Sequence, residues 1–361
     1  MKTAIIMGTR PEIIKLSELT KILRGKNSEI VFTGQHYDYN MSLQFIKEFG
    51  MREPDYKMKL TQLQNTTTDR ATQIGEIVLK LAKIITKIDP DTVIVQGDTN
   101  TVLAASLTSM KCGIPISHIE SGLRSYDWRM PEEHNRITVD HISEFLFAPT
   151  KDAKEKLVNE KVHGKIFVTG NTSIDVIEKN IHKITKNFST PIQKNDFILL
   201  TLHRGENVDN YKTLVSISKA LISCNTDIVF PAHPRTIKQL RKFGLYNKIK
   251  NSKNIHIIPP IGYFDMINLM KKCQFIISDS GGIQEEATAP SIRKKVIVIR
   301  NTTDRPEAVK LGFSELVGTN SKEIINAINR NLINSKIKSK KSPYGKGDAS
   351  KKIANILKKQ F

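Results

Sequence analysis

The feature that most constrains the fold of this 361-residue chain is an alternation of short, β-branched apolar runs with longer amphipathic stretches. Short runs of this kind are typical of buried strands, and the stretches between them have the spacing of helices. Strands that alternate with helices predict parallel sheets with helices on both faces. The expected strands are residues 4–7, 29–33, 92–95, 115–119, 145–148 and 166–169 in the first half and 197–202, 227–231, 255–258, 275–278 and 296–300 in the second.

Length and cysteine content narrow the class of protein further. A single hydrophobic core rarely extends over 361 residues, so we expect two domains. The three cysteines stand singly, and no apolar segment is long enough to span a bilayer. These facts argue against a disulfide framework, a zinc knuckle and a membrane protein. We therefore expect a cytoplasmic protein that needs neither a metal nor another cofactor.

The charge balance is strongly basic. The chain carries 56 lysines and arginines against 36 acids, a net charge of +20, and residues 336–361 hold nine lysines beside a single acid, Asp348. Such a balance favours nucleic acid or phosphate-bearing ligands. No aromatic platform, helix-turn-helix pattern or zinc finger accompanies the lysines, so nucleic acid is the weaker interpretation. A lysine-rich tail is more often a solvated surface.

Unusual polar clusters come directly after the expected strands. They are GTRPE (8–12), QGDTN (96–100), ESGLR (120–124), HRGEN (203–207), AHPR (232–235), DSGGIQEE (279–286) and NTTDRPE (301–307). In an open parallel sheet the carboxyl ends of the strands form the binding crevice. The clusters of the two halves therefore predict a ligand site in a cleft between two domains.

Two of these clusters suit a phosphate group. The first has the spacing of a simple capping box, yet Arg10 adds a cation where a helix begins. In DSGGIQEE, Gly281 and Gly282 let backbone N–H groups approach a phosphate, and Glu286 has a spacing that suits ribose hydroxyls. Neither cluster is a dinucleotide fingerprint or a P-loop. We interpret DSGGIQEE as a nucleotide site, and leave GTRPE open between function and structure.

Histidines also stand at strand ends, at positions 118, 203 and 233. Three histidines on three loops could ligate zinc. However, Arg204 and Arg235 lie beside two of them, and an arginine would repel a cation and suits a diphosphate better. The histidines at positions 203 and 233 are thus expected to face phosphate, although a lone histidine is often merely structural.

Three acids, Asp98, Glu120 and Glu132, stand at or just beyond neighbouring strand ends. They could do no more than pair with nearby arginines. Three acids next to an anion-binding cluster indicate proton transfer instead. The G-x-S-x-G pattern is absent, so serine hydrolase chemistry is not expected.

Nine motifs, in order along the chain, resemble those of the non-hydrolysing UDP-N-acetylglucosamine (UDP-GlcNAc) 2-epimerases. They are GTRPE (8–12), QGDT (96–99), HIESGLR (118–124), MPEEHNR (130–136), TGNTSID (169–175), HRGEN (203–207), HPR (233–235), DSGGIQEE (279–286) and TTDRPEAV (302–309), and SPYGKGDAS (342–350) resembles the closing loop of that family. The resemblance implies two Rossmann-like parallel-sheet domains with an interdomain cleft, as in glycosyltransferase-B enzymes. We place the first domain at residues 1–171, completed by a C-terminal helix at 350–361, and the second, UDP-binding domain at 172–349.

The resemblance also implies an activity and roles for single residues. The expected enzyme is an isomerase of polysaccharide biosynthesis that interconverts UDP-GlcNAc and UDP-N-acetylmannosamine (UDP-ManNAc). It would eliminate UDP to leave 2-acetamidoglucal and then add UDP back. The catalytic positions fall on Asp98, Glu120, Glu132 and His203, and the substrate contacts fall on Arg10, Lys15, Arg136, His203, Met266, Ser280, Gly281, Gly282, Glu286 and Arg305. A second, activating UDP-sugar would contact Gln35, His36, Arg70 and Arg204.

The resemblance does not fix the exact substrate or reaction. We expect a homodimer with no nucleic-acid or membrane partner. Sister enzymes that act on diacetamido-uronic sugars share the first-half motifs but tend to lose the E-E pair and the R-P-E, which this chain keeps as Glu285–Glu286 and residues 305–307. Met266 stands where the family often has an aromatic residue. A glycosyltransferase of the same architecture, a hydrolysing epimerase and a nucleotide-sugar sensor also fit parts of the pattern.

Overall fold

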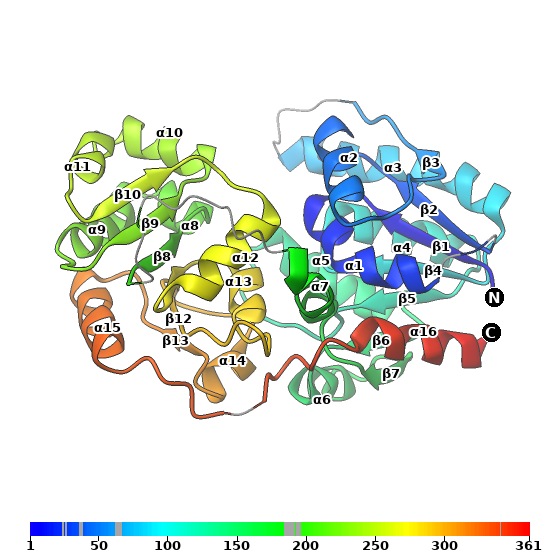
Figure 1. Ribbon diagram of the computed structural model, residues 1–361. Coiled ribbons are helices and arrows are strands. Elements are labelled where there is room, and N and C mark those ends of the chain that lie inside the picture. Colours follow the sequence, from blue (N-terminus) through cyan, green and yellow to red (C-terminus); the bar gives the residue numbers. More distant parts are fainter. Residues whose placement is uncertain are drawn as a thin grey trace. The chain divides into compact units, whose positions relative to one another are not determined.

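The computed structural model describes the whole chain apart from residues 24, 26, 36–38, 62–66, 184–191, 193–195 and 340. The described chain forms two compact units, shown in Figure 1. Unit 1 comprises Met1–Val176 and Gly345–Phe361, and unit 2 comprises Ile177–Tyr344. The chain thus leaves unit 1 inside helix α7 (Thr172–Asn180), beyond residue 171, and returns to it at Gly345, ahead of the expected terminal helix.

Unit 1 is built on a seven-stranded sheet in which every strand pair is parallel, in the order β3-β2-β1-β4-β5-β6-β7. Its strands are β1 (Thr3–Met7), β2 (Ser28–Phe32), β3 (Tyr56–Lys57), β4 (Thr92–Gln96), β5 (Ile116–Ile119), β6 (Phe145–Ala148) and β7 (Lys165–Val168). Its helices are α1 (Arg10–Ile22), α2 (Tyr39–Glu48), α3 (Thr67–Ile88), α4 (Asn100–Lys111), α5 (Pro131–His141), α6 (Lys151–Asn159), the first half of α7, and α16 (Ala349–Gln360). The expected strands and helices of an α/β fold are confirmed.

The central strands of unit 1 are buried along their whole length because helices cover both faces of a parallel sheet. All five residues of β1 are buried, and so are all five of β4. Helices α3 and α4 pack together, and α16 packs against α1. The backbone N–H groups of Ala349 and Ser350 donate to the carboxylate of Asp175, at 3.0 and 2.5 Å, which anchors the start of α16 within unit 1.

Unit 2 repeats the plan with a six-stranded, all-parallel sheet in the order β10-β9-β8-β11-β12-β13. Its strands are β8 (Ile198–Thr201), β9 (Ile228–Pro231), β10 (Ile255–Ile258), β11 (Ile276–Ser278), β12 (Val296–Val298) and β13 (Ser314–Leu316). Its helices are α8 (Gly205–Val208), α9 (Tyr211–Ile222), α10 (Pro234–Lys242), α11 (Tyr246–Lys250), α12 (Tyr263–Lys272), α13 (Gly281–Glu286), α14 (Pro306–Lys310) and α15 (Ser321–Ile333), after the short 3₁₀ helix η1 (Ile181–Lys183).

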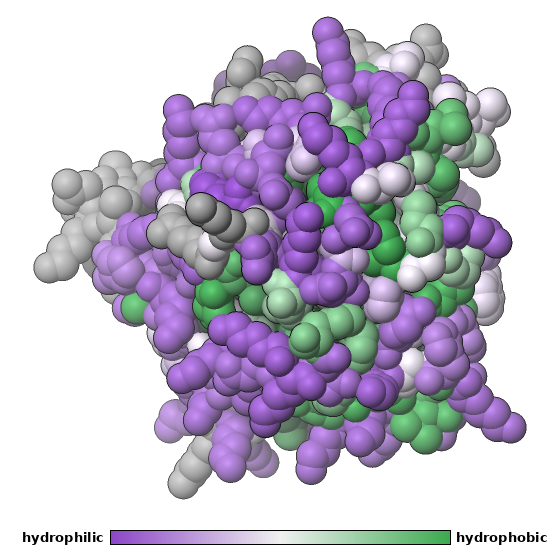
Figure 2. Space-filling model, turned by 90° about the vertical axis from the view of Figure 1, so that its right-hand side faces the viewer, coloured by the Kyte–Doolittle hydropathy of each residue, from purple (hydrophilic) through white to green (hydrophobic). Residues whose placement is uncertain are grey.

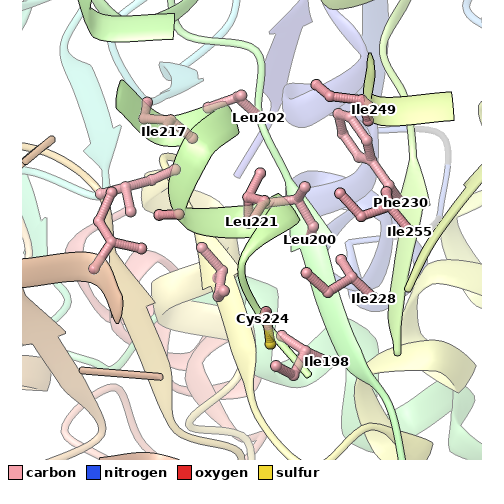
Figure 3. Packing of buried hydrophobic residues seen from close by; sticks show 14 of the residues in the cluster. Ile198, Leu200, Leu202, Ile217, Leu221, Cys224, Ile228, Phe230, Ile249 and Ile255 are labelled. Atoms are coloured by element: carbon pink, nitrogen blue, oxygen red, sulfur yellow. The ribbon is translucent and has the colours of Figure 1, made fainter. Parts of the chain in front are cut away.

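One face of the unit 2 sheet carries the cluster of buried side chains in Figure 3. Ile198 and Leu200 of β8 meet Ile228 and Phe230 of β9, and Leu221 of α9 covers them. The buried residues of this cluster are 9% exposed or less, so their side chains are almost completely removed from water. Burial of one such side chain contributes about 1.5–3 kcal/mol to folding.

Two strands were not predicted, β3 and β13, and each is one of the two outermost strands of its sheet. An outermost strand pairs with a neighbouring strand on one side only, and helices do not cover both of its faces along its full length. It can therefore be short and partly polar, as in Tyr56–Lys57 and in Ser314–Leu316, whose middle residue is a glutamate. Such segments lack the apolar run that revealed the other strands.

The face shown in Figure 2 is largely hydrophilic, with apolar side chains gathered in small patches. Exposed apolar surface of this scattered kind is normal on a folded protein. In the part of the chain that the structure describes, none of the helices combines the length and hydropathy needed to cross a bilayer.

Candidate active site

The sheet order of unit 1 reverses between β1 and β4, and loops at such a reversal form the usual binding crevice of an open parallel sheet. The loop after β1 carries Gly8 and Thr9 and leads into Arg10, the first residue of α1, and the loop after β4 carries Gly97–Thr99. The next strand, β5, delivers Glu120 at the same edge. The sequence motifs GTRPE, QGDT and HIESGLR are thus neighbours at one edge of the sheet.

Asp98 is held by helix α5. Its carboxylate Oδ2 lies 2.6 Å from Arg136 Nη2, and its backbone carbonyl accepts a hydrogen bond from Asn135 Nδ2 at 2.9 Å. Arg136 is in turn 3.2 Å from Glu133 Oε2, and its side chain is only 5% exposed. The guanidinium therefore bridges two carboxylates and fixes the direction of the Asp98 side chain.

Glu120 follows β5 with a backbone φ of +72°, which is unusual for a residue other than glycine. Its carboxylate Oε2 lies 2.5 Å from Lys15 Nζ on α1 and accepts a hydrogen bond from Gln96 Nε2 at 2.8 Å. The side chain of Glu120 is 7% exposed. Strained backbone combined with a charged, directed side chain is typical of a functional position.

Glu132 stands in the first turn of α5, and its residue is partly buried. Within the described chain its carboxylate has no hydrogen-bond or ion-pair partner. It differs in this respect from Asp98 and Glu120, whose carboxylates are oriented by Arg136 and Lys15.

Arg10 opens helix α1 and is exposed, with its guanidinium carbon 4.3 Å from the centre of the Phe45 ring. Glu12, two residues later, is buried and ties the neighbouring loops together. Its carboxylate accepts hydrogen bonds from the backbone N–H groups of Gly8 and Thr9 and from the hydroxyl of Thr99. Glu12 thus connects the loop that carries Arg10 with the loop that carries Asp98.

This burial makes Glu12 a source of pH-dependent stability. Desolvation raises the pKa of its carboxyl from 4.5 to about 7, against the opposing effect of the hydrogen bond from Thr99. Because the folded pKa lies above the unfolded one, the contribution to stability is present below about pH 4.5 and is lost as the pH rises towards 7.

We expect the difference in unfolding free energy between the unsubstituted protein and Glu12→Gln to fall by about 1–3 kcal/mol between pH 5 and pH 8. The amide cannot ionise, so this difference isolates the titration of Glu12 from that of other groups. Urea unfolding at a series of pH values measures it. A difference that stays constant over this range would contradict the expectation.

In unit 2 the strand order reverses between β8 and β11, and the expected nucleotide residues lie there. Asp279, after β11, is completely buried and accepts hydrogen bonds from the backbone N–H groups of His203 and Arg204, at 3.0 and 2.8 Å. Its Oδ1 is 3.1 Å from His203 Nδ1. Although burial acts to raise it, the hydrogen bonds from His203 and Arg204 hold the pKa of Asp279 below its ordinary value. Asp279 therefore orients the His203 ring.

Ser280 caps the short helix α13 by accepting a hydrogen bond from Ile283 N–H at 3.4 Å. Gly281 follows it, and a Cβ there would stand 3.5 Å from Asp304 Oδ1 and 3.7 Å from Arg305 Cζ. These are ordinary contact distances, so the buried Gly281 lies directly beside the charged pair of Asp304 and Arg305. Gly282 and Glu286 lie on the same helix and are partly buried.

Arg305 is fixed from two sides. Its guanidinium pairs with the Glu285 carboxylate of α13 and lies 2.7 Å from Asp304 Oδ2. All three side chains are at most 7% exposed. The guanidinium of Arg305 is thus oriented before any ligand is present. Met266, on α12, is partly buried.

The residues expected to bind a second UDP-sugar show no hydrogen bonds or ion pairs to one another in the described part of the chain. Gln35 Oε1 accepts hydrogen bonds from the backbone N–H and the hydroxyl of Thr101, both at 2.8 Å, so this side chain already has a structural role in unit 1. Arg70 is exposed on α3, and Arg204 belongs to unit 2. His36 lies outside the described residues.

Sequence reasoning missed the residues that hold the others in place. Asp279, Glu133 and Gln96 belong to the quoted motifs, but nothing in their spacing said which neighbour each would orient. The zinc interpretation of the histidines finds no support in the described chain, where no group of three metal-ligating side chains occurs. His118 is instead hydrogen-bonded to Asp140 and to the Gly97 carbonyl.

Comparison with known proteins identifies the family of this chain. Residues 21–358 match the family model described as UDP-N-acetylglucosamine 2-epimerase. The chain belongs to that family. A curated UDP-N-acetylglucosamine 2-epimerase from Methanocaldococcus jannaschii is 41% identical, with 99% of each chain covered. An enzyme from Pseudomonas aeruginosa, named UDP-2,3-diacetamido-2,3-dideoxy-D-glucuronate 2-epimerase, is 36% identical, with 99% of this chain and 100% of the relative covered.

Solved structures of the epimerase family have the same fold. The crystal structure of the M. jannaschii UDP-GlcNAc 2-epimerase in complex with UDP-GlcNAc and UDP matches with a TM-score of 0.88 at 40% identity, covering 99% of this chain and 100% of that one. The two-domain, parallel-sheet α/β class expected from sequence is therefore confirmed.

Proposed function

We propose that this protein is a UDP-GlcNAc 2-epimerase, an isomerase that reversibly interconverts UDP-GlcNAc and UDP-ManNAc. The observation that carries the proposal is the pair of directed carboxylates in unit 1. Asp98 and Glu120 stand at the ends of β4 and β5, each oriented by a cation, in a chain that belongs to this epimerase family.

The chemistry of the sugar explains why such carboxylates are needed. Carbon 2 is not adjacent to a carbonyl group, so removal of its proton alone would leave an unstabilised carbanion. Departure of the diphosphate from carbon 1 develops positive charge there and makes the carbon 2 proton acidic. A carboxylate base can then take that proton, and UDP leaves as 2-acetamidoglucal forms. A second acid returns a proton to the other face of carbon 2 while UDP adds back to carbon 1.

In this proposal the remaining groups bind the UDP part of the substrate, most of them at its diphosphate. His203, Arg305 and the backbone N–H groups of Gly281 and Gly282 stabilise its departing charge, with the His203 ring oriented by Asp279. Arg10 and Lys15 add cations from unit 1. Glu286 takes the ribose hydroxyls, and Ser280, Arg136 and Met266 complete the substrate contacts.

The test is incubation of the purified protein with UDP-GlcNAc in deuterated water, followed by proton NMR. UDP-ManNAc should form and should carry deuterium at carbon 2, because the new carbon–hydrogen bond takes its proton from solvent. Slow release of UDP and 2-acetamidoglucal should accompany turnover. Retention of the original hydrogen through many turnovers, or transfer of the sugar to an added acceptor, would contradict the proposal.

A second candidate substrate has a specific observation in its favour, the 36% identity to the diacetamido-glucuronate enzyme. This chain keeps Glu285 and Arg305 as a buried ion pair, in the motifs that we expect the sister enzymes to lose. We therefore favour plain UDP-GlcNAc. Parallel incubation with the diacetamido-uronic substrate decides between the two.

The proposal extends to regulation and setting. A second UDP-GlcNAc would act as an activator through Gln35, His36, Arg70 and Arg204, and the protein would work as a cytoplasmic homodimer in polysaccharide biosynthesis. An activator predicts a lag when UDP-ManNAc is the only substrate, relieved by a trace of UDP-GlcNAc. Light scattering of the purified protein measures its oligomeric state.

UDP binding gives a further prediction. Arg10→Ala and His203→Ala should each weaken UDP binding by about 1.5–3 kcal/mol, because each removes one charge-assisted donor to the diphosphate. Titration calorimetry with UDP measures this. Arg330→Ala is the matched control, since this exposed arginine pairs with Glu315 on the surface of unit 2. Unchanged affinity in both test variants would remove these residues from the phosphate site.

A further inference from the structure

His118 is a buried histidine to which the proposed chemistry gives no role. It lies on β5, two residues before Glu120, and its side chain is completely excluded from solvent. A buried imidazole must satisfy both ring nitrogens inside the protein, because water cannot reach them. The identity of its two partners therefore reveals where its protons are.

Both ring nitrogens of His118 face hydrogen-bond acceptors. Nε2 lies 2.8 Å from the backbone carbonyl oxygen of Gly97, and Nδ1 lies 2.7 Å from Asp140 Oδ1. A carbonyl oxygen can only accept, so Nε2 must carry a hydrogen. The proton on Nδ1 then depends on whether Asp140 is ionised.

The surroundings of Asp140 favour the carboxylate. Its Oδ2 accepts a hydrogen bond from Gly122 N–H at 3.0 Å and lies 2.7 Å from Arg124 Nη1. An ionised Asp140 accepts on both oxygens, so Nδ1 of His118 must donate as well.

The charges around Asp140 favour the same state. Arg124 pairs with Glu160 as well as with Asp140, and the side chains of Arg124, Asp140 and His118 are completely buried, whereas Glu160 is 25% exposed and also lies 3.8 Å from His141 Nε2. Because Arg124 is shared between two carboxylates, a doubly protonated His118 adds positive charge beside the buried Asp140.

The bond to Gly97 connects this cluster with Asp98. Gly97 has a φ of +84°, a conformation that side-chain-bearing residues rarely adopt, and it directly precedes Asp98. His118 holds the Gly97 carbonyl, Asn135 holds the Asp98 carbonyl, and Arg136 holds the Asp98 carboxylate. The peptide on each side of Asp98 is therefore tied to a separate donor.

We propose that His118 is a positioning residue, an imidazolium that donates from Nδ1 to Asp140 and from Nε2 to Gly97 and so fixes the backbone from which Asp98 reaches the substrate. The effect of His118 on turnover rests on the proposed epimerase function. The positive charge of His118 and its two hydrogen bonds are independent of that function.

The first experiment reads the ring directly and needs no substrate. In protein labelled with ¹⁵N-histidine at pH 8, the two ring nitrogens of His118, assigned by their loss in His118→Gln, should both show the shift of a protonated nitrogen. Free histidine, measured at high and at low pH, supplies the neutral and protonated reference shifts. A neutral His118 ring would overturn the proposal.

The second experiment separates the two hydrogen bonds. A glutamine at 118 can place its amide N–H near the position of Nε2 and keep the bond to Gly97, whereas an asparagine reaches only the position of Nδ1. His118→Gln should therefore keep kcat within about fivefold, and His118→Asn should lose about 10²-fold in kcat with little change in KM, because misplacement of a reacting group by about 1 Å has this effect.

The outcomes remain distinguishable if stability suffers. Equal losses of kcat in both variants would show a merely structural role and would overturn the proposal, as would full activity of His118→Asn. If His118→Asn does not fold, a 10²-fold loss in His118→Gln would still overturn it. If the unsubstituted protein does not interconvert the two UDP-sugars, the proposed function fails, and the ¹⁵N spectrum alone decides the state of His118.

Discussion

Asp98→Asn, Glu120→Gln and Glu132→Gln should bind UDP about as tightly as the unsubstituted protein, yet at least two of them should turn over about 10²-fold more slowly or worse, the size expected for lost general acid–base catalysis. Each amide keeps the shape of the side chain and removes its capacity to exchange a proton. Affinity for UDP should persist because His203, Arg305 and Gly281, which are assigned to the diphosphate, belong to unit 2.

The measurement pairs NMR-detected turnover with UDP titration calorimetry. Glu155→Gln is the matched control, since this glutamate is exposed on α6 and should affect neither quantity. Full activity in all three test variants would show that the roles given to these acids are wrong. A loss of UDP affinity as large as the loss of turnover would show that the substitutions damage binding and not proton transfer.

The second large effect is on stability. Arg124→Met should lower the free energy of unfolding by about 3–5 kcal/mol, because removal of one partner leaves a buried charge uncompensated. The Arg124 side chain is completely buried between Asp140 and Glu160, at 2.7 and 2.5 Å. Methionine has similar length, so the loss comes from the missing charge and hydrogen bonds and not from a large cavity.

Urea unfolding followed by circular dichroism measures this effect. Arg129→Met is the matched control in the same loop, because the Arg129 side chain is 87% exposed and its surface pair with Asp127 should be worth less than about 1 kcal/mol. Equal stabilities of the two variants would mean that water or rearrangement compensates the buried Asp140, and would contradict the interpretation of the cluster as a tightly coupled ionic group.

Much of the fold could be predicted because strands between two layers of helices have nearly unbroken apolar runs. The β1 and β4 segments are examples, since all ten of their residues are buried. The outermost strands β3 and β13 lack this signal because they are only two and three residues long and contain polar residues. The spacing of Asn320 and Glu323 resembles a capping box and predicts a helix from there to about residue 334. The structure places α15 at Ser321–Ile333, with Asn320 accepting a hydrogen bond from Lys322 N–H.

The placement of the candidate motifs at strand ends could be predicted from the sequence, but the contacts between their side chains could not. Polar clusters after strands are visible in sequence because the carboxyl ends of parallel strands share one edge. Which side chain orients which is not visible, because the partners are far apart along the chain. Lys15 and Glu120 are 105 residues apart, and Asp279 holds the backbone of His203 from 76 residues away. Such pairs depend on how strands are ordered in the sheet, which apolar periodicity does not encode.

The return of the chain to unit 1 at Gly345 has a consequence for biosynthesis. Unit 2 is, in effect, an insertion within unit 1, whose last helix α16 packs on its first, α1, and is anchored by Asp175. During translation the ribosome releases β1 first, yet the helix that covers α1 emerges only after all of unit 2. The surface of α1 that α16 covers must therefore stay uncovered while the whole second sheet is synthesised. Only then can Ile353, Ala354 and Leu357 of α16 pack against unit 1. Premature termination before Gly345 would thus harm the part of the protein that was synthesised earliest.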